Sequence, residues 1–472
     1  MDNTKLVSSL KEAISLCELD DSMSISFHHH LRNGDFILNM VMDEIAALGI
    51  KDITINASSI FDRHSALLEH IENGVVSRIR TDYMSSALGK SISEGIMNNP
   101  VEFRTHGGRP ADIDSGKTPI DIAFIAAPAS DPMGNCSGKI GKSACGSLGY
   151  AIADAQNAKH VIIITDTLMP YPLIDCSISE INVDYVVVVD AIGDPQGIVS
   201  GTTQITRDPV GLIMASEAVK VIKASGLLTD GFSFQTGAGG ASLAAAKFLK
   251  ETMVKENIKG SFGLGGITGY MVDMLNAGCF RSLLDVQCFD LKAVESIRTN
   301  PNHQEISAMH YASPSSMSAV VDSLDVVILG ATEIDTDFNV NVHTDSNGYI
   351  MGGSGGHSDT AAGAKLSMII APMFRGRLPI VTDRVNCIST PGKDVDVLVT
   401  QGGIAVNPRN VELKSRLLDA GLPIIDIHDL KLKAESYTGI PVKAPRGDKI
   451  VAEVISRDGG VLDKIYSVPR RY

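Results

Sequence analysis

The sequence predicts an α/β fold with mainly parallel strands, and three observations support this. Short runs of apolar, β-branched residues alternate with longer amphipathic segments along the whole chain. The strand-like runs are apolar throughout instead of alternating with polar residues, which is typical of parallel strands covered on both faces. The 472 residues exceed what one compact core accommodates, which indicates two or three domains.

Seven apolar runs are expected to form strands, and four amphipathic stretches between them are expected to form helices. The predicted strands are Ile53–Ile55, Ile122–Ala126, Val161–Thr165, Tyr185–Asp190, Val326–Leu329, Met368–Ala371 and Val395–Val399. The predicted helices are Asn39–Leu48, Pro209–Ala224, Ala241–Lys255 and Asn410–Ala420. The order predicts a sheet flanked by helices in each part of the chain.

Two segments recur along the chain at nearly the same spacing. Asp21-Ser-Met-Ser-Ile matches Asp230-Gly-Phe-Ser-Phe (230 − 21 = 209), and DIAFIAAPASDPMGN from Asp121 matches DVVILGATEIDTDFN from Asp325 (325 − 121 = 204). The second match aligns Asp121, Asp131 and Asn135 with Asp325, Asp335 and Asn339. We therefore expect two similar domains, residues 1–225 (the first half) and 226–472 (the second half).

Composition excludes several classes of protein. The net charge of −14 argues against a general nucleic-acid surface, because such surfaces are basic. The longest apolar runs fall short of a membrane span, and the N-terminus lacks the pattern of a secretory signal, so we expect a cytoplasmic protein without membrane or nucleic-acid partners. The seven cysteines show no paired spacing, and most are expected to be buried apolar residues.

Three glycine-rich segments in the second half could bring backbone N–H groups close to an anion. They are FSFQTGAGGAS (Gly237, Gly239, Gly240), GSFGLGGITG (Gly263, Gly265, Gly266) and MGGSGGHSD (Gly352, Gly353, Gly355, Gly356). Bare backbone at a helix N-terminus suits anion binding or an oxyanion hole. The alternative is that the glycines only allow tight turns.

The second glycine segment also admits a dinucleotide-binding interpretation, with Asp285 as the acid that binds the ribose. This interpretation is the weaker one. The residues before the segment make a poor buried strand, and the glycine spacing departs from the fingerprint.

The segment FHHHLRNGD gathers His28, His29, His30, Arg32 and Asn33 after a predicted strand end. If the segment stays extended, His28 and His30 share one face and His29 points to the other. No cysteine or carboxylate follows at a metal-ligand spacing, so we expect no metal and favour an anion-binding cluster. The alternative is a polar turn with exposed histidines.

The segment FRTHGGRP places Arg104, His106 and Arg109 around two glycines with no acid between them. Guanidinium groups match carboxylates in a bidentate manner. We therefore expect a second anion clamp here, with a solvated loop as the alternative.

Together these motifs resemble the CoA-transferase superfamily. DIAFIAAPASDPMGNCS resembles a strand and loop of that family, with Asn135 where an aromatic residue is common. DVVILGATEIDTDFNVN, which contains Glu333, MGGSGGHSD, which ends at Asp359, and QGGIAVNPR resemble motifs of the family's second half. FHHHLRNGD points to the citrate lyase alpha-chain branch.

The resemblance implies an acyl transfer from an acetyl thioester to citrate. It assigns citrate to His28, His29, His30, Arg32, Asn33, Arg104, His106 and Arg109; oxyanion and thioester stabilisation to Gly237, Gly239, Gly240, Gly263, Gly265 and Gly266; and thioester binding to Asn135, Glu333, Gly352, Gly353, Gly355, Gly356 and Asp359. The site would lie at the interface of the two halves.

One departure from the superfamily bears on the mechanism. Many members carry a nucleophilic glutamate in the segment that corresponds to GSFGLGGITG, and residues 261–268 contain no carboxylate. The resemblance therefore implies direct attack by a citrate carboxylate in a ternary complex. Glu333 is the weaker alternative as a nucleophile.

The resemblance also implies partners: acetyl-CoA or an acetyl acyl carrier protein with a CoA-like phosphopantetheine group, the citrate lyase beta and gamma chains, and further copies of this chain. No tightly bound cofactor is expected. The competing interpretations are a thioester hydrolase on the same fold, a non-catalytic scaffold subunit and a nicotinamide-dependent oxidoreductase.

Overall fold

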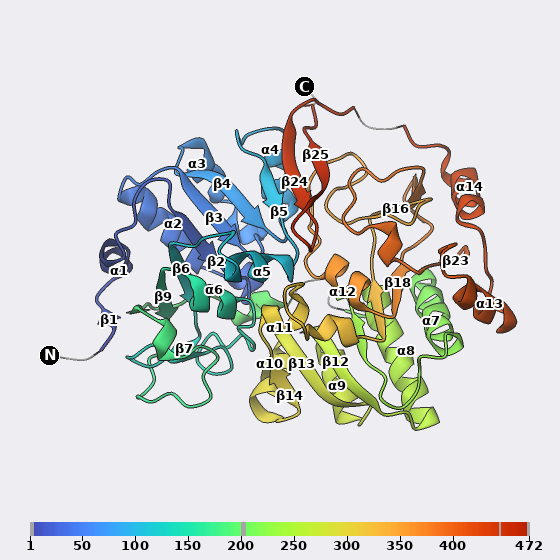
Figure 1. Cartoon of the computed structure of the whole chain (residues 1–472), viewed down its shortest axis with the longest axis horizontal. Coiled ribbons are helices and arrows are strands. Elements are labelled where there is room, and N and C mark those ends of the chain that lie inside the picture. The colour runs from blue at the N-terminus through green and yellow to red at the C-terminus, as the bar shows by residue number, and fades with distance from the viewer. Residues whose placement is uncertain (1–3, 200–203, 443–444, 470–472) are drawn as a thin grey trace.

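Two large sheets, each flanked by helices, form the framework of the molecule (Figure 1). The computed structural model describes residues 4–199, 204–442 and 445–469. Most strands within each sheet are parallel, as the continuous apolar runs predict. None of the helices in these ranges is long and apolar enough to span a membrane.

The first sheet has the strand order β1-β10-β9-β6-β2-β3-β4-β5-β24-β25. Its strands are β1 (Leu6–Val7), β2 (Ser24–Phe27), β3 (Ile53–Ala57), β4 (Val76–Thr81), β5 (Val101–Phe103), β6 (Ile122–Ala126), β9 (His160–Thr165), β10 (Tyr185–Val188), β24 (Ile450–Ile455) and β25 (Val461–Tyr466).

The second sheet has the order β14-β13-β12-β11-β15-β18-β22-β23. Its strands are β11 (Phe234–Thr236), β12 (Gly260–Ile267), β13 (Phe280–Cys288), β14 (His303–Glu305), β15 (Val326–Leu329), β18 (Leu366–Ile370), β22 (Val397–Thr400) and β23 (Gly403–Val406). The short strands β7 (Ala129–Ser130), β8 (Cys136–Ser137), β16 (Glu333–Asp335), β17 (Val340–Asn341), β19 (Phe374–Arg375), β20 (Leu378–Pro379) and β21 (Val381–Thr382) pair in three small sheets.

The helices cover the sheets and meet at the interface, where α5, α6 and α11 contact one another. Their bounds are α1 (Leu10–Leu16), α2 (Ile37–Ala47), α3 (Leu67–Glu72), α4 (Ser86–Ser93), α5 (Gly108–Asp114), α6 (Ala151–Asn157), α7 (Pro209–Ala224), α8 (Gly240–Glu256), α9 (Gly269–Asn276), α10 (Leu291–Thr299), α11 (Ala308–Ala312), α12 (His357–Gly363), α13 (Val411–Asp419) and α14 (Ile427–Thr438).

Seven strands follow the same order in both sheets, β10-β9-β6-β2-β3-β4-β5 in the first and β22-β18-β15-β11-β12-β13-β14 in the second, and the repeated sequence segments occupy equivalent places. β2 pairs with β6, and β11 pairs with β15, in parallel in both cases. The N–H of Ser24 donates to Asp121 at 2.8 Å, and the N–H of Ser233 donates to Asp325 at 2.8 Å. The sequence repeat thus corresponds to a structural repeat.

The C-terminal hairpin β24–β25 departs from the predicted division into residues 1–225 and 226–472. It belongs to the first sheet, where β24 pairs in parallel with β5; Figure 1 shows the hairpin in red beside β5. The division itself stays a prediction, because a continuous cluster of buried apolar residues also joins the two halves.

The predicted strands and helices are confirmed, with shifted ends. Helix α2 begins earlier than expected, since the Asp35 carboxylate accepts a hydrogen bond from the N–H of Leu38. The seven cysteines are free, and all except the partly exposed Cys176 are buried. The glycine segment GSFGLGGITG forms a strand and not a turn, because residues 260–267 are strand β12. Its glycines therefore lie within a strand and not in the strand-to-helix turn of a dinucleotide site.

Candidate functional site at the interface of the two halves

The histidine segment leaves the carboxyl end of β2 and remains extended enough to separate its side chains. His28 Nδ1 contacts His30 Nδ1, whereas His29 Nδ1 shares a 2.6 Å hydrogen bond with Ser58 Oγ. All three rings are buried, and burial lowers their pKa values, that of His28 to about 4. They are therefore neutral near pH 7 and offer hydrogen bonds instead of positive charge.

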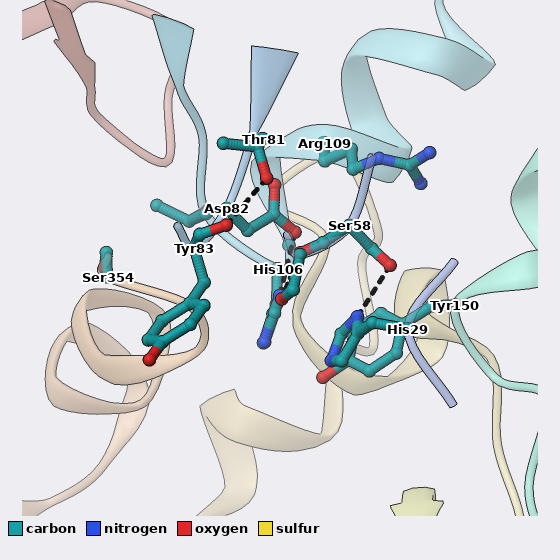
Figure 2. Close-up of polar contacts among 12 residues, drawn as sticks. His29, Ser58, Thr81, Asp82, Tyr83, His106, Arg109, Tyr150 and Ser354 are labelled. Carbon is teal, nitrogen blue, oxygen red and sulfur yellow. Dashed lines mark hydrogen bonds and ion pairs between the residues drawn. The ribbon is translucent and has the colours of Figure 1, made fainter. Parts of the chain in front are cut away.

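His106 lies next to this segment and is oriented by a buried carboxylate (Figure 2). Its Nδ1 donates to Asp82 Oδ2 at 2.8 Å, and burial raises the pKa of Asp82 against the opposing effect of His106. The rings of His29 and His106 both pack on Tyr150, with centroids 4.7 and 4.5 Å away. An ionised carboxylate only accepts, so the proton sits on Nδ1 and Nε2 of His106 remains available.

The third glycine segment, from the second half, is hydrogen-bonded to the strand ends of the first half. The N–H of Met84 donates to the Gly352 carbonyl, the N–H of Gly355 donates to the Asp82 carbonyl, and the N–H of His106 donates to the Gly355 carbonyl. A Cβ on Gly355 would lie 3.1 Å from His106 Nε2, and the residue has a φ of +50°. Only glycine fits this approach without strain.

Two of the three predicted citrate-binding arginines are already neutralised by carboxylates. Arg109 makes a bidentate, buried ion pair with Asp154, and Arg104 pairs with Glu102 and Asp112. Figure 2 shows the Arg109 guanidinium directed away from His29 and His106. The sequence search missed these partners because they flank the segment or come from α6. The assignment of Arg104 and Arg109 to citrate stays a prediction.

Arg32 is different, because no carboxylate of the described residues pairs with it. Its guanidinium lies over the rings of Phe289 and Phe61, at 4.9 and 5.5 Å from the centroids. Its buried Nη1 has no hydrogen-bond partner. Burial lowers the pKa of Arg32 from its usual value, but a guanidinium keeps its charge. A partly buried cation without a carboxylate partner among the described residues is ready to accept an anionic ligand.

The glycines of β12 lie next to Arg32 and Phe289. A register shift separates Gly265 and Gly266 along β12. A Cβ on Gly266 would lie 2.2 Å from the Phe289 ring, and one on Gly265 would lie 2.7 Å from the Gln235 amide. The Gln235 Nε2 in turn donates to Tyr311 at 2.9 Å. Gly263, deeper in the strand, packs on Met271 and Leu283 instead.

The first glycine segment joins β11 to α8 as predicted. The N–H of Gly237 is occupied by the Ile328 carbonyl at 3.0 Å. Gly239 and Gly240 stand at the start of the 17-residue helix α8, where the first N–H groups lack partners within the helix.

The remaining predicted site residues divide into two groups. Asp359 belongs to the interface, since it accepts from Thr105 Oγ1 and from the N–H of Gly107. Gly352 also belongs to the interface, because its carbonyl accepts from the N–H of Met84. Two others have partners elsewhere: Asn135 binds Asp131 and Glu180, and Glu333 binds Asn341 and Asn386. Asn33 is exposed. Glu333 therefore supports a loop of the second half.

Sequence reasoning missed several residues of the cluster: Ser58, Asp82, Tyr150, Gln235, Phe289 and Tyr311. Ser58 and Asp82 directly follow β3 and β4. Because ligands bind beyond the carboxyl ends of parallel strands, inspection of the residues after each predicted strand would have found them.

Comparison with known proteins gives a consistent result. Residues 3–468 match the family model described as citrate lyase, alpha subunit. The citrate lyase alpha chain of Klebsiella pneumoniae is 49% identical over 98% of this chain and 91% of the relative, and that of Escherichia coli is 49% identical over the same shares.

Solved structures agree with the sequence match. The alpha subunit of citrate lyase from Streptococcus mutans, in complex with citrate, superposes with a TM-score of 0.97 at 50% identity, covering 99% of this chain and 92% of that one. A Pseudomonas malonate decarboxylase hetero-tetramer in complex with malonate gives a TM-score of 0.70 at 16% identity, covering 92% and 86%. The second likeness is one of fold alone.

Proposed function

Because this chain belongs to the family of citrate lyase alpha subunits, the citrate CoA-transferases of that enzyme, we propose that it exchanges the acetyl group of an acetyl thioester for citrate. The products are a citryl thioester and acetate. The observation that carries this proposal is Arg32, a partly buried cation beside the glycines of β12 that pairs with no carboxylate of the described residues.

Arg32 supplies the charge that holds citrate, and the neutral imidazoles supply directional hydrogen bonds. His106 presents Nε2 as a hydrogen-bond acceptor, because Asp82 holds the proton on its Nδ1. His29 lies between Ser58 and Tyr150 and close to His106. Fixed polar groups of this kind orient citrate for attack and lower the entropic cost of the reaction.

The exchange proceeds by direct attack. A citrate carboxylate oxygen attacks the acetyl carbonyl, the thiolate leaves, and a mixed anhydride forms; the thiolate then attacks the citryl carbonyl and acetate leaves. Residues 261–268 hold no carboxylate, and Asp82 and Asp359 nearby are fully buried and hydrogen-bonded. No general base is needed, since citrate is already ionised at neutral pH.

Backbone N–H groups stabilise the oxyanion that forms on the thioester carbonyl. Gly239 and Gly240 at the start of α8 and the bulge at Gly265 and Gly266 are the candidate donors. Such preorganised donors contribute about 3–4 kcal/mol each where they act on an oxyanion.

The thioester is carried by CoA or by an acyl carrier protein with a CoA-like phosphopantetheine arm. The chain works in a complex with citrate lyase beta and gamma chains and with other copies of itself. Its location in the cytoplasm stays a prediction from the sequence.

A single-turnover experiment tests the proposal. The purified chain is mixed with acetyl-CoA and citrate labelled with ¹⁸O in its carboxylates, and acetate and citryl-CoA are analysed by mass spectrometry. Direct attack places one ¹⁸O atom in acetate during the first turnover. A covalent glutamyl intermediate would give unlabelled acetate in that turnover and a protein adduct reducible by borohydride.

The same reaction with unlabelled citrate in H₂¹⁸O separates transfer from hydrolysis. Label from water in acetate without citryl-CoA would replace the proposal by a thioester hydrolase. If free CoA gives no turnover, the measurement is made with acetylated carrier protein, and absence of transfer there contradicts the proposal.

A further inference from the structure

A second cluster of chemically reactive side chains lies behind the proposed site. Asp285 and Cys288 stand at the carboxyl end of β13, and His303 begins the neighbouring strand β14. Cys288 Sγ lies 3.0 Å and His303 Nε2 lies 2.9 Å from Asp285 Oδ2. One carboxylate oxygen, the sulfur and the imidazole nitrogen all lie within 4.8 Å of one another.

The cluster leaves one carboxylate oxygen without a partner. Asp285 is 0% exposed, and its Oδ1 makes no hydrogen bond. A buried, unsatisfied carboxylate oxygen is costly. Cys288 and His303 both lie against the other oxygen, Oδ2, so a cation bound by both carboxylate oxygens would satisfy Oδ1.

We propose that Asp285, Cys288 and His303 bind one divalent metal ion of the zinc class. The three side chains offer an oxygen, a sulfur and a nitrogen, and a bidentate carboxylate would complete four-coordination. This mixed set of donors favours Zn²⁺ over Mg²⁺ or Ca²⁺, which prefer oxygen ligands.

Neighbouring residues fit a metal site. Ser296 Oγ lies 3.0 Å from His303 Nδ1, so it can hold the ring with Nε2 toward the ion, as partners of metal-bound histidines do. A cysteine binds a metal ion as the thiolate, so metal binding displaces a proton from Cys288. We expect the metal affinity to rise with pH.

The position also gives the ion a structural role. Gln287, between two of the proposed ligands, donates from Nε2 to the His29 carbonyl at 2.8 Å. The ion would join this end of β13 to β14, and Gln287 connects the same end of β13 to the histidine segment.

Metal analysis tests the inference. The full chain, reduced and stripped with a chelator, is titrated with Zn²⁺ and separately with Co²⁺ at pH 6 and pH 8. We expect one tightly bound metal ion per chain, with a higher affinity at pH 8 than at pH 6. With Co²⁺ we expect a thiolate-to-cobalt charge-transfer band. Cys288→Ala should abolish the band, whereas Cys279→Ala, at the other end of β13, should retain it.

Two conservative variants guard against misfolding of the cysteine variant. Asp285→Asn and His303→Gln should each lose the metal while the circular dichroism spectrum of the chain is kept, and Ser296→Ala should weaken binding about tenfold. Absence of a tight equivalent in the folded wild-type chain, or equal binding by all variants, overturns the inference. The readout is metal content, so failure of the proposed transfer reaction would leave it standing.

Discussion

Thr105 Oγ1 donates a hydrogen bond to Asp359 Oδ1 at 2.8 Å, and this contact joins the two halves beside His106. The second oxygen of Asp359 accepts from the N–H of Gly107 at 2.9 Å. A carboxylate at the start of α12 thus holds the loop that carries His106. Its protonation is expected to affect how firmly the halves are joined.

The raised pKa of Asp359 predicts that the stability of the fold depends on pH. Burial raises its pKa to about 6, against the opposing effects of Gly107, Arg457, Thr105 and His106. The folded state therefore binds this proton more tightly than the unfolded state. The stabilising contribution is fully present below the unfolded pKa of about 4 and is lost as pH rises through 6.

The measurement is the melting temperature from pH 4.5 to 7.5 for the wild type and for Asp359→Asn. The difference between the two curves isolates Asp359 from other titrating groups. We expect the variant's melting temperature to rise relative to wild type as pH increases through 6. A difference that does not vary with pH would contradict the raised pKa.

Replacing Arg32 is expected to lower the affinity for citrate specifically. Replacement by Gln removes an unpaired guanidinium and keeps a polar side chain, and a charged hydrogen bond contributes about 1.5–3 kcal/mol. We expect the KM for citrate to rise roughly 10- to 100-fold with little change in the KM for acetyl-CoA. Steady-state kinetics of citryl-CoA formation measure both.

Arg63→Gln is the matched control, since Arg63 also lies over an aromatic ring, that of Phe36 at 4.6 Å, but is exposed. It should leave both KM values unchanged. An unaltered citrate KM in Arg32→Gln would remove Arg32 from the proposed site.

The Arg109–Asp154 pair predicts a loss of stability and not of substrate binding. Both side chains are buried and joined by two hydrogen bonds, so Arg109→Met leaves a buried carboxylate unpaired and costs about 3–5 kcal/mol. The double variant Arg109→Met/Asp154→Leu should recover part of this free energy. Urea unfolding measures the free energy of unfolding of each variant.

Lys292→Met is the control for Arg109→Met. It breaks a partly exposed ion pair with Asp273 and should lower the free energy of unfolding by less than about 1 kcal/mol. If the double variant regains stability but shows a large rise in citrate KM, Arg109 binds citrate after all, and the sequence-based assignment holds.

Gly353 predicts a steric requirement at the interface. A Cβ on Gly353 would lie 2.2 Å from the Asp82 carbonyl oxygen, so Gly353→Ala must push the glycine segment away from the strand that carries Asp82. We expect a fall in kcat/KM of at least tenfold, because misplaced catalytic groups lose their alignment. Gly330→Ala is the control, since nothing lies within 4 Å of a Cβ there. Equal activity of the two variants would contradict the packing.

The sequence by itself determined the class of fold, the repeat and the chemical character of the site. Continuous apolar runs specify buried parallel strands wherever they occur, and the aligned Asp121 and Asp325 make the same hydrogen bond in both halves. The motif FHHHLRNGD also placed Arg32 and the histidines at a strand end, because local sequence sets where a strand stops.

Only the tertiary structure decided which charged groups are available. Arg109 and Arg32 look alike in the sequence. In the structure, Asp154 on α6 neutralises Arg109, whereas Arg32 lies over the ring of Phe289 from residues 226–472. The glycines of residues 260–267 form a strand because β11 and β13 pair on either side of it, and β24 joins the first sheet across hundreds of residues. Pairing and charge compensation depend on partners distant in the chain, which local patterns do not encode.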